Sequence, residues 1–139
     1  MAESPLHLLV LAGGESTRIG GAGPKSLLGL CGRPLLGHVL EAASSIPLES
    51  RSLVVGAKHG DEIRAWMTEN AEDSWEIVLQ PEALGTGDAV RCALDVLPEE
   101  GRVLILYGDM PLLTSETLGF IAEQETSAML TAVVDDPTG

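Results

Sequence analysis

Short apolar runs alternate with helical patterns along this sequence. A run that ends in glycines or polar residues predicts a buried strand, and apolar residues at helical spacing predict a helix. The expected strands cover residues 6–12, 52–55, 76–79, 102–107 and 128–134. The expected helices cover residues 34–44, 59–69 and 86–97, and a fourth begins at Thr114 or Ser115 and ends near Glu123. Strict alternation of strand and helix predicts a parallel sheet with helices on both faces.

The fold class that this pattern indicates is α/β, a Rossmann-like three-layer sandwich with a mostly parallel sheet. Hydrophobic residues make up 45% of the 139 residues, enough for a real core in one domain that spans 1–139. No repeat or low-complexity linker divides the chain. Ligands of such sheets bind at the carboxyl ends of the strands, so the loops at that edge are the candidates for function.

The charge balance is strongly acidic, with 8 Lys and Arg against 21 Asp and Glu and a net charge of −13. Such a field repels nucleic acids and anionic membranes, so we expect neither as a partner. A small phosphate compound fits only where the few cations gather. The N-terminus lacks a signal peptide's basic region, and no apolar stretch reaches the roughly 20 residues that cross a bilayer. We therefore expect a cytoplasmic protein, in which Cys31 and Cys92 are packed thiols without disulfide or zinc-site spacing.

A glycine-rich loop follows the first expected strand, with the sequence LAGGESTR and then GGAGPK. Consecutive glycines let the backbone turn tightly and point several N–H groups at phosphate oxygens. Arg18 and Lys25 add two cations to the same loop. The spacing matches neither GxGxxG nor GxxxxGK[ST], which excludes the standard dinucleotide and P-loop motifs. Alone, the loop fits either a phosphate site or a flexible turn.

A second loop, Tyr107-Gly108-Asp109, follows the most apolar of the expected strands. A carboxylate at this position can hold a divalent cation beside phosphates, or it can cap a turn before Pro111. Both interpretations stay open from this loop alone.

The third loop has the sequence QPEALGTGDA over residues 80–89. The amide of Gln80 offers a donor and an acceptor in one plane, which suits the edge of a nucleotide base. Gly85-Thr86-Gly87 opens a helix with free backbone N–H groups, although such a turn is also an ordinary helix start. Three such loops at one edge of a sheet favour a nucleotide site.

The motifs LAGGESTRIGGAGPKSL, QPEALGTGDA, LILYGDMPLL and VVDDPTG resemble those of sugar-nucleotide pyrophosphorylases. The most similar group is the uridylyltransferase domain of bacterial bifunctional N-acetylglucosamine-1-phosphate uridylyltransferases, whose motif order matches over essentially the whole chain. Against that group's LAAGxGTRM pattern, Gly13 replaces an alanine, Ser16 a glycine and Ile19 a methionine. LAGGxSxR also resembles the MobA-like molybdenum-cofactor guanylyltransferases, so the first motif leaves the base open, whereas the later motifs favour uracil.

The resemblance implies a nucleotide-diphospho-sugar transferase fold and a cell-wall precursor enzyme. With Mg²⁺, such an enzyme transfers UMP from UTP to N-acetylglucosamine 1-phosphate and releases pyrophosphate. The resemblance also implies roles for individual residues. Arg18 and Lys25 would hold the phosphates and stabilise the charge of the transition state, and Asp109 would be a Mg²⁺ ligand. The residues implied to contact the nucleotide are Leu11, Ala12, Gly13, Gly14, Gln80, Gly85 and Thr86, and those implied to contact the sugar are Tyr107, Gly108 and Gly139.

The sequence ends at Gly139, inside the family's sugar-binding motif. Members of the family continue through a second magnesium ligand, an asparagine, and the bifunctional members form trimers through a further β-helical domain. The resemblance therefore implies a domain truncated on its C-terminal side. Two alternatives stay open: a nucleotidyltransferase that uses GTP or CTP, and a non-catalytic nucleotide-binding fragment.

Overall fold

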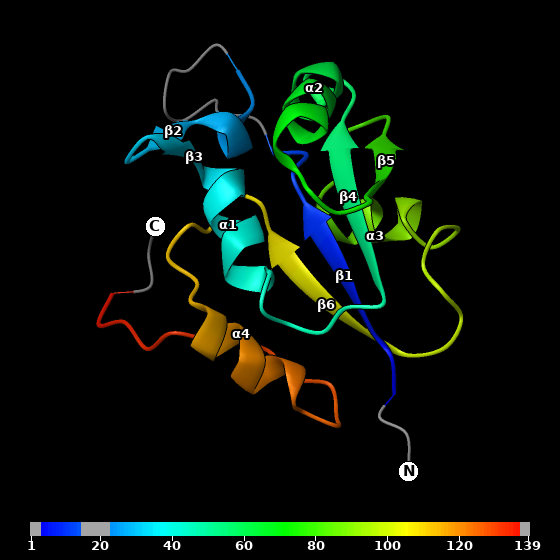
Figure 1. The fold of residues 1–139 in the computed structure, drawn as a ribbon, viewed down its shortest axis with the longest axis vertical. Coiled ribbons are helices and arrows are strands. Elements are labelled where there is room, and N and C mark those ends of the chain that lie inside the picture. Colours follow the sequence, from blue (N-terminus) through cyan, green and yellow to red (C-terminus); the bar gives the residue numbers. More distant parts are fainter. Residues whose placement is uncertain (1–3, 15–22, 137–139) are drawn as a thin grey trace.

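A parallel sheet forms the centre of the computed structural model, which describes residues 4–14 and 23–136. Within these residues the sheet has four strands in the order β5-β4-β1-β6 (Figure 1). Their bounds are β1 (Leu6–Leu11), β4 (Ser50–Gly56), β5 (Glu76–Gln80) and β6 (Arg102–Tyr107). Two short strands, β2 (Gly29–Leu30) and β3 (Arg33–Pro34), form a separate antiparallel hairpin. The predicted α/β class and parallel sheet are confirmed.

Helices cover both faces of the sheet, as the alternating pattern predicts. Their bounds are α1 (Leu35–Ala43), α2 (Gly60–Asn70), α3 (Thr86–Cys92) and α4 (Ser115–Ala122). Figure 1 shows α1 and α2 in front of the sheet and α3 behind it. Leu36, Ile63 and Leu118 bring α1, α2 and α4 into one core with alternate residues of the strands, while Ala89 and Ala93 pack against the opposite face.

The second face is covered unevenly. Leu9 and Leu11 of β1 are buried beneath α3 and the turn that follows it. In β6, Ile105 and Tyr107 stand beside these two residues in register, yet both are exposed. The sequence of β6 predicts burial on both faces, but in the described part of the chain only one face of this edge strand is covered.

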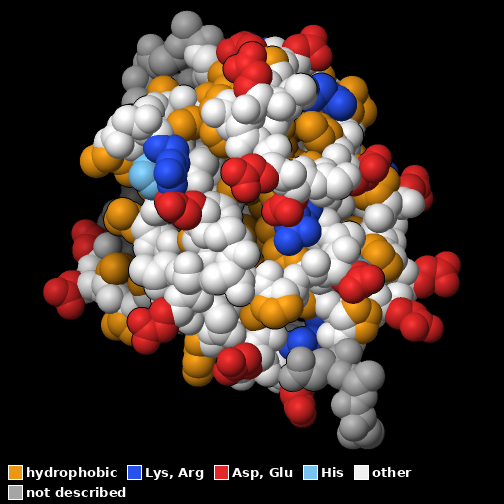
Figure 2. Space-filling model, in the orientation of Figure 1, with side chains coloured by type: hydrophobic (Ala, Val, Ile, Leu, Met, Phe, Trp, Pro, Cys, Tyr) orange, Lys and Arg blue, Asp and Glu red, His pale blue; other side chains and the backbone are white. Residues whose placement is uncertain are grey.

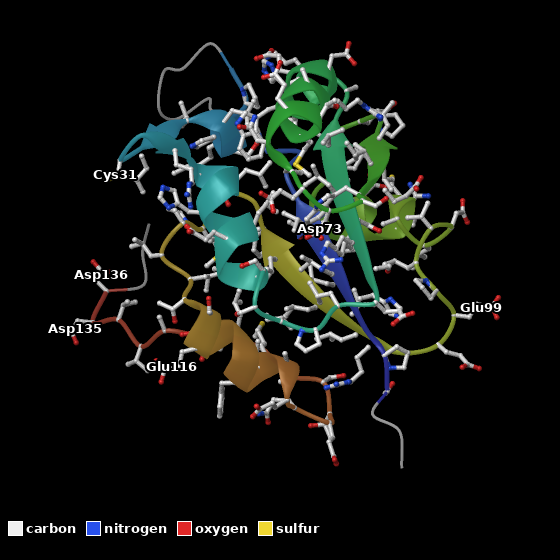
Figure 3. All side chains as sticks on the ribbon, viewed as in Figure 1. Cys31, Asp73, Glu99, Glu116, Asp135 and Asp136 are labelled. Carbon is white, nitrogen blue, oxygen red and sulfur yellow. The ribbon has the colours of Figure 1, made fainter. Side chains whose placement is uncertain are left out.

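The expected strand at residues 128–134 is wrong. This segment follows α4 without helix or strand structure, and Met129 and Val133 are almost fully exposed. A strand needs a neighbour for its backbone N–H and C=O groups, and no described segment lies alongside this one as a partner. Figure 3 shows the labelled Asp135 and Asp136, which directly follow this segment, well away from the sheet.

The prediction that both cysteines are packed thiols is correct for Cys92 and wrong for Cys31. Both thiols are free, and Cys92 is partly buried in α3. Cys31 is instead exposed at the tip of the β2–β3 hairpin (Figure 3), where it adopts a positive φ of 50° beside Gly32. The tight two-residue turn, and not a core position, accounts for its place.

The surface carries the acidity of the sequence. Figure 2 shows Asp and Glu side chains spread over the face in view, with Lys and Arg at a few separate places. Among the described residues, no helix has both the length and the apolar character that a bilayer crossing needs.

Candidate active site

A cavity of about 180 Å³ opens at the carboxyl ends of the strands. Its wall combines the three loops that the sequence singles out. The lining residues are Leu11, Ala12, Gly13, Gly14, Lys25, Ser26, Gln80, Gly85, Thr86, Ala89, Tyr107 and Asp109. Parallel β1, β5 and β6 all end at this edge, which is why loops distant in sequence meet here.

An ion pair forms one side of the cavity. Lys25 begins a short 3-10 turn, η1 (Lys25–Leu27), and Asp109 lies two residues beyond the end of β6. Lys25 Nζ lies 2.6 Å from Asp109 Oδ2, and the two side chains are 37% and 30% exposed. The cation predicted to hold phosphate and the carboxylate predicted to hold a metal ion are therefore in direct contact.

A buried amide forms the opposite side. Gln80 is the last residue of β5, where the pairing with Gly56 of β4 fixes its backbone. Its side chain is only 5% exposed, and Nε2 donates to the Gly85 carbonyl at 3.1 Å and to Asp88 Oδ2 at 2.9 Å. A buried amide with both donors satisfied is held rigidly.

Asp88 is a residue of this site that the sequence analysis missed. It lies in the first turn of α3, and Arg91 donates to its other oxygen, with Nε at 3.1 Å. The hydrogen bond from Gln80, and then that from Arg91, lowers the pKa of the Asp88 carboxyl below its ordinary value of 3.8. The hydrogen bond between Arg91 and Asp88 also raises the pKa of Arg91. An Asp and an Arg three residues apart in a helix are a recognisable signal, but the sequence did not show that Gln80 joins them.

Ser26 was also missed. It is 2% exposed and lines the cavity, and its hydroxyl has no hydrogen-bond partner among the described residues. Its place directly after Lys25 is the only signal in the sequence.

Two candidates for sugar contact occupy different positions. Tyr107 lines the cavity and is half-exposed. Gly108 does not line it: its N–H donates to the Leu11 carbonyl at 2.9 Å, and a Cβ there would lie 3.2 Å from that of Ala12. Gly108 therefore allows β1 and the loop after β6 to approach each other.

Arg18 and Gly139 lie outside the described residues, so their roles stay predictions. In the described ranges, no cluster of three or more His, Cys, Asp or Glu residues could hold a metal ion. Of the described residues that line the cavity, Asp109 is the one with a carboxylate. That arrangement fits Mg²⁺, which commonly takes one or two carboxylates and completes its shell with phosphates and water.

The fold and the site place the chain in the class of α/β proteins that bind a ligand at the carboxyl edge of a parallel sheet. Within that class, the MobA-like NTP transferase domain matches residues 8–138, and the chain belongs to this family.

The curated relatives are much longer than this chain. The bifunctional protein GlmU of Halorhodospira halophila is 44% identical over 136 residues, which cover 98% of this chain and 28% of that protein. GlmU of Psychrobacter sp. is also 44% identical, with 96% and 29% covered. The chain thus spans under a third of these relatives.

Solved structures share the architecture. Rv0371c of Mycobacterium tuberculosis H37Rv superposes with a TM-score of 0.73 at 27% identity, covering 88% of this chain and 61% of that one. A complex of Rv0371c with manganese has a TM-score of 0.68 at 26% identity, covering 86% and 58%.

Proposed function

We propose that this chain carries the nucleotide site of a uridylyltransferase. The reaction transfers UMP from UTP to N-acetylglucosamine 1-phosphate and gives UDP-N-acetylglucosamine and pyrophosphate. The observation that carries the proposal is the convergence of Lys25, Gln80 and Asp109 on one cavity, from three loops that resemble those of such enzymes. The identity to GlmU over nearly the whole chain supports it.

The proposed chemistry is one in-line displacement at phosphorus. A phosphate oxygen of the sugar phosphate attacks the α-phosphorus of UTP, the bond from that phosphorus to the bridging oxygen breaks, and pyrophosphate leaves. No covalent intermediate with the protein is required, so the protein contributes by positioning and by charge stabilisation.

Residues on the two sides of the cavity would bind different parts of the substrates. Gln80, with the backbone of Gly85 and Thr86, would hold the base, and the backbone of residues 11–14 would lie along the nucleotide. Lys25 would place its ammonium on the phosphates, with Arg18 as a second cation. Tyr107, Gly108 and Gly139 would border the sugar.

Asp109 would hold the divalent cation. We take the cation to be Mg²⁺; the manganese complex of Rv0371c supports the use of a divalent ion by a protein of similar fold. When bound, such an ion would neutralise phosphate charge and polarise the reacting phosphorus. Because Lys25 now neutralises Asp109, phosphates that draw Lys25 away would also free the carboxylate for the ion.

The test is pyrophosphate release by the chain with N-acetylglucosamine 1-phosphate and Mg²⁺, with UTP, CTP and GTP compared at equal concentration. We expect release with UTP to exceed that with either other nucleotide, and to require the sugar phosphate. A preference for GTP or CTP would instead support a different nucleotidyltransferase. UTP binding without any release would support a non-catalytic nucleotide-binding fragment.

A further inference from the structure

The orientation of the Gln80 amide decides what this residue can offer to a ligand. An amide presents a donor at one end and an acceptor at the other, and the two ends are almost equal in size. Packing alone would not distinguish the two orientations. The hydrogen-bond partners must do so.

Both partners of the Gln80 nitrogen are acceptors. The Gly85 carbonyl oxygen cannot donate, and neither can an ionised Asp88 carboxylate. The lowered pKa of Asp88 keeps that carboxylate ionised at neutral pH, and Arg91 holds its other oxygen. The Asp88 side chain is 12% exposed, so water competes little for it. The NH₂ end of Gln80 must therefore face Asp88 and Gly85.

The Gln80 oxygen then points the other way. A Cβ at Gly13 would lie 3.0 Å from Gln80 Oε1, so this oxygen lies against the glycine-rich loop. Gly13 and Gln80 both line the cavity. Among the described residues, Oε1 accepts no hydrogen bond. The group that Gln80 presents at the cavity wall is thus an acceptor, and the described part of the chain supplies no donor to it.

We propose that Asp88 is a positioning residue for base selection: it fixes the Gln80 amide so that the site presents a carbonyl oxygen to the nucleotide base. A base whose ring nitrogen carries hydrogen, as N3 of uracil does, can donate to that oxygen. The N3 of cytosine is an acceptor and would face it without a hydrogen bond. This inference rests on the proposed function, because it assigns the base to the Gln80 side.

The isosteric substitution Asp88→Asn separates this role from the bulk of the side chain. Asparagine has a single acceptor oxygen, and both Arg91 and the Gln80 nitrogen require it. When that oxygen serves Arg91, the asparagine NH₂ faces Gln80 and favours the flipped amide. The variant therefore mixes the two orientations while the volume of the site is kept.

The experiment compares the dissociation constants of UTP and CTP by calorimetry, for the wild type and for Asp88→Asn. We expect the wild type to bind UTP about tenfold more tightly, which corresponds to about 1.4 kcal/mol. We expect Asp88→Asn to reduce that ratio about fivefold, mainly by weakening UTP.

Two matched variants separate the amide from other effects. Asp61→Asn makes the same chemical change in the first turn of α2, away from the cavity, and should keep the wild-type ratio. Arg91→Ala removes the ion pair but leaves an acceptor for Gln80, and should keep the ratio within about twofold. Equal losses in Arg91→Ala and Asp88→Asn would overturn the proposal, because the ion pair and not the acceptor would then matter.

The wild type alone also tests the idea if Asp88→Asn fails to fold. The two Gln80 Nε2 protons should exchange slowly with water, before and after UTP is added, because both are hydrogen-bonded in a buried side chain. Rapid exchange of these protons with water would contradict a fixed amide. An unchanged ratio in folded Asp88→Asn, with UTP still preferred by the wild type, would overturn only the role of Asp88. A wild type that prefers CTP would overturn the uridine assignment as well.

Discussion

The two sides of the cavity hold their polar groups in opposite ways. On the amide side, Gln80 is buried, both of its N–H donors are used, and Asp88 and Arg91 continue the network. On the ion-pair side, Lys25 and Asp109 are each about one-third exposed and form an ion pair with one another. Under the proposed function, the amide side is already arranged for the base, whereas the ion pair must open before Lys25 can bind phosphate or Asp109 the ion.

This difference indicates where ligand binding requires rearrangement. A preorganised group gives selectivity without an ordering cost, while an exposed ion pair contributes little to stability and separates easily. We therefore expect substitutions on the ion-pair side to affect turnover most. Those on the amide side should affect the choice of base.

The largest effect is expected for Lys25→Ala. Loss of the ammonium removes a charge from the phosphates as they separate, and we expect pyrophosphate release to fall about 100-fold. Arg33→Ala is the matched control, because Arg33 forms an exposed ion pair with Glu41 away from the cavity. Its rate should stay within about twofold of the wild type, and a similar loss in both variants would contradict the role of Lys25.

A smaller effect, in two opposite directions, is expected for divalent-ion binding. Lys25→Ala should strengthen Mn²⁺ binding to the nucleotide-free chain about threefold, because the ammonium no longer competes for Asp109. Asp109→Asn should weaken Mn²⁺ binding in the presence of UTP about tenfold. Electron paramagnetic resonance of free Mn²⁺ measures both, and Asp61→Asn serves as the control. Unchanged binding in Asp109→Asn would remove Asp109 from the ion site.

On the amide side, Gly13→Ala should weaken UTP binding about threefold. The new Cβ would lie 3.0 Å from Gln80 Oε1. Because the nitrogen of the same amide donates to Asp88, the oxygen can move little to relieve this contact. Gly29→Ala is the control, since a Cβ there meets nothing within 4 Å. Calorimetric titration with UTP compares the two. Equal affinities would show that Oε1 adjusts freely and that the amide side is not rigid.

The smallest effect is a dependence of stability on pH. The hydrogen bond from Gln80, and then Arg91, lowers the pKa of Asp88 in the folded chain. A carboxyl with a depressed folded pKa stabilises the fold above its ordinary pKa, and this contribution is lost as the pH falls through the depressed value. From about pH 5 to about pH 2.5, the wild type should therefore lose more free energy of unfolding than Asp88→Asn. Urea unfolding at both pH values measures the free energy of unfolding of the two proteins. Equal losses in the wild type and in Asp88→Asn would contradict the network.

Much of the fold was predictable from local pattern. The apolar runs that became β1 and β6 and the periodic segments that became α1 and α2 sit within a few residues of their expected bounds. The failure at 128–134 has a physical reason: an apolar, extended segment becomes a strand only beside a partner, which its own sequence does not reveal.

For the candidate site, the sequence predicted which loops meet at the cavity but not the contacts between their residues. The loops that contain Lys25, Gln80 and Asp109 were expected to meet, because parallel strands end at one edge. The pairing of Lys25 with Asp109 joins residues far apart in the chain, and the bond from Gln80 to Asp88 depends on how the chain turns between β5 and α3. Such contacts are set by tertiary structure, so Asp88 was missed.

The most direct test of the two-sided site is a crystal structure of the chain with UTP and Mn²⁺. We predict that Lys25 Nζ leaves Asp109 for a phosphate oxygen, that Asp109 contacts the ion, and that Gln80 still donates to Asp88 while its oxygen accepts from the uracil N3–H. An intact Lys25–Asp109 pair, or a base bound away from Gln80, would contradict the account.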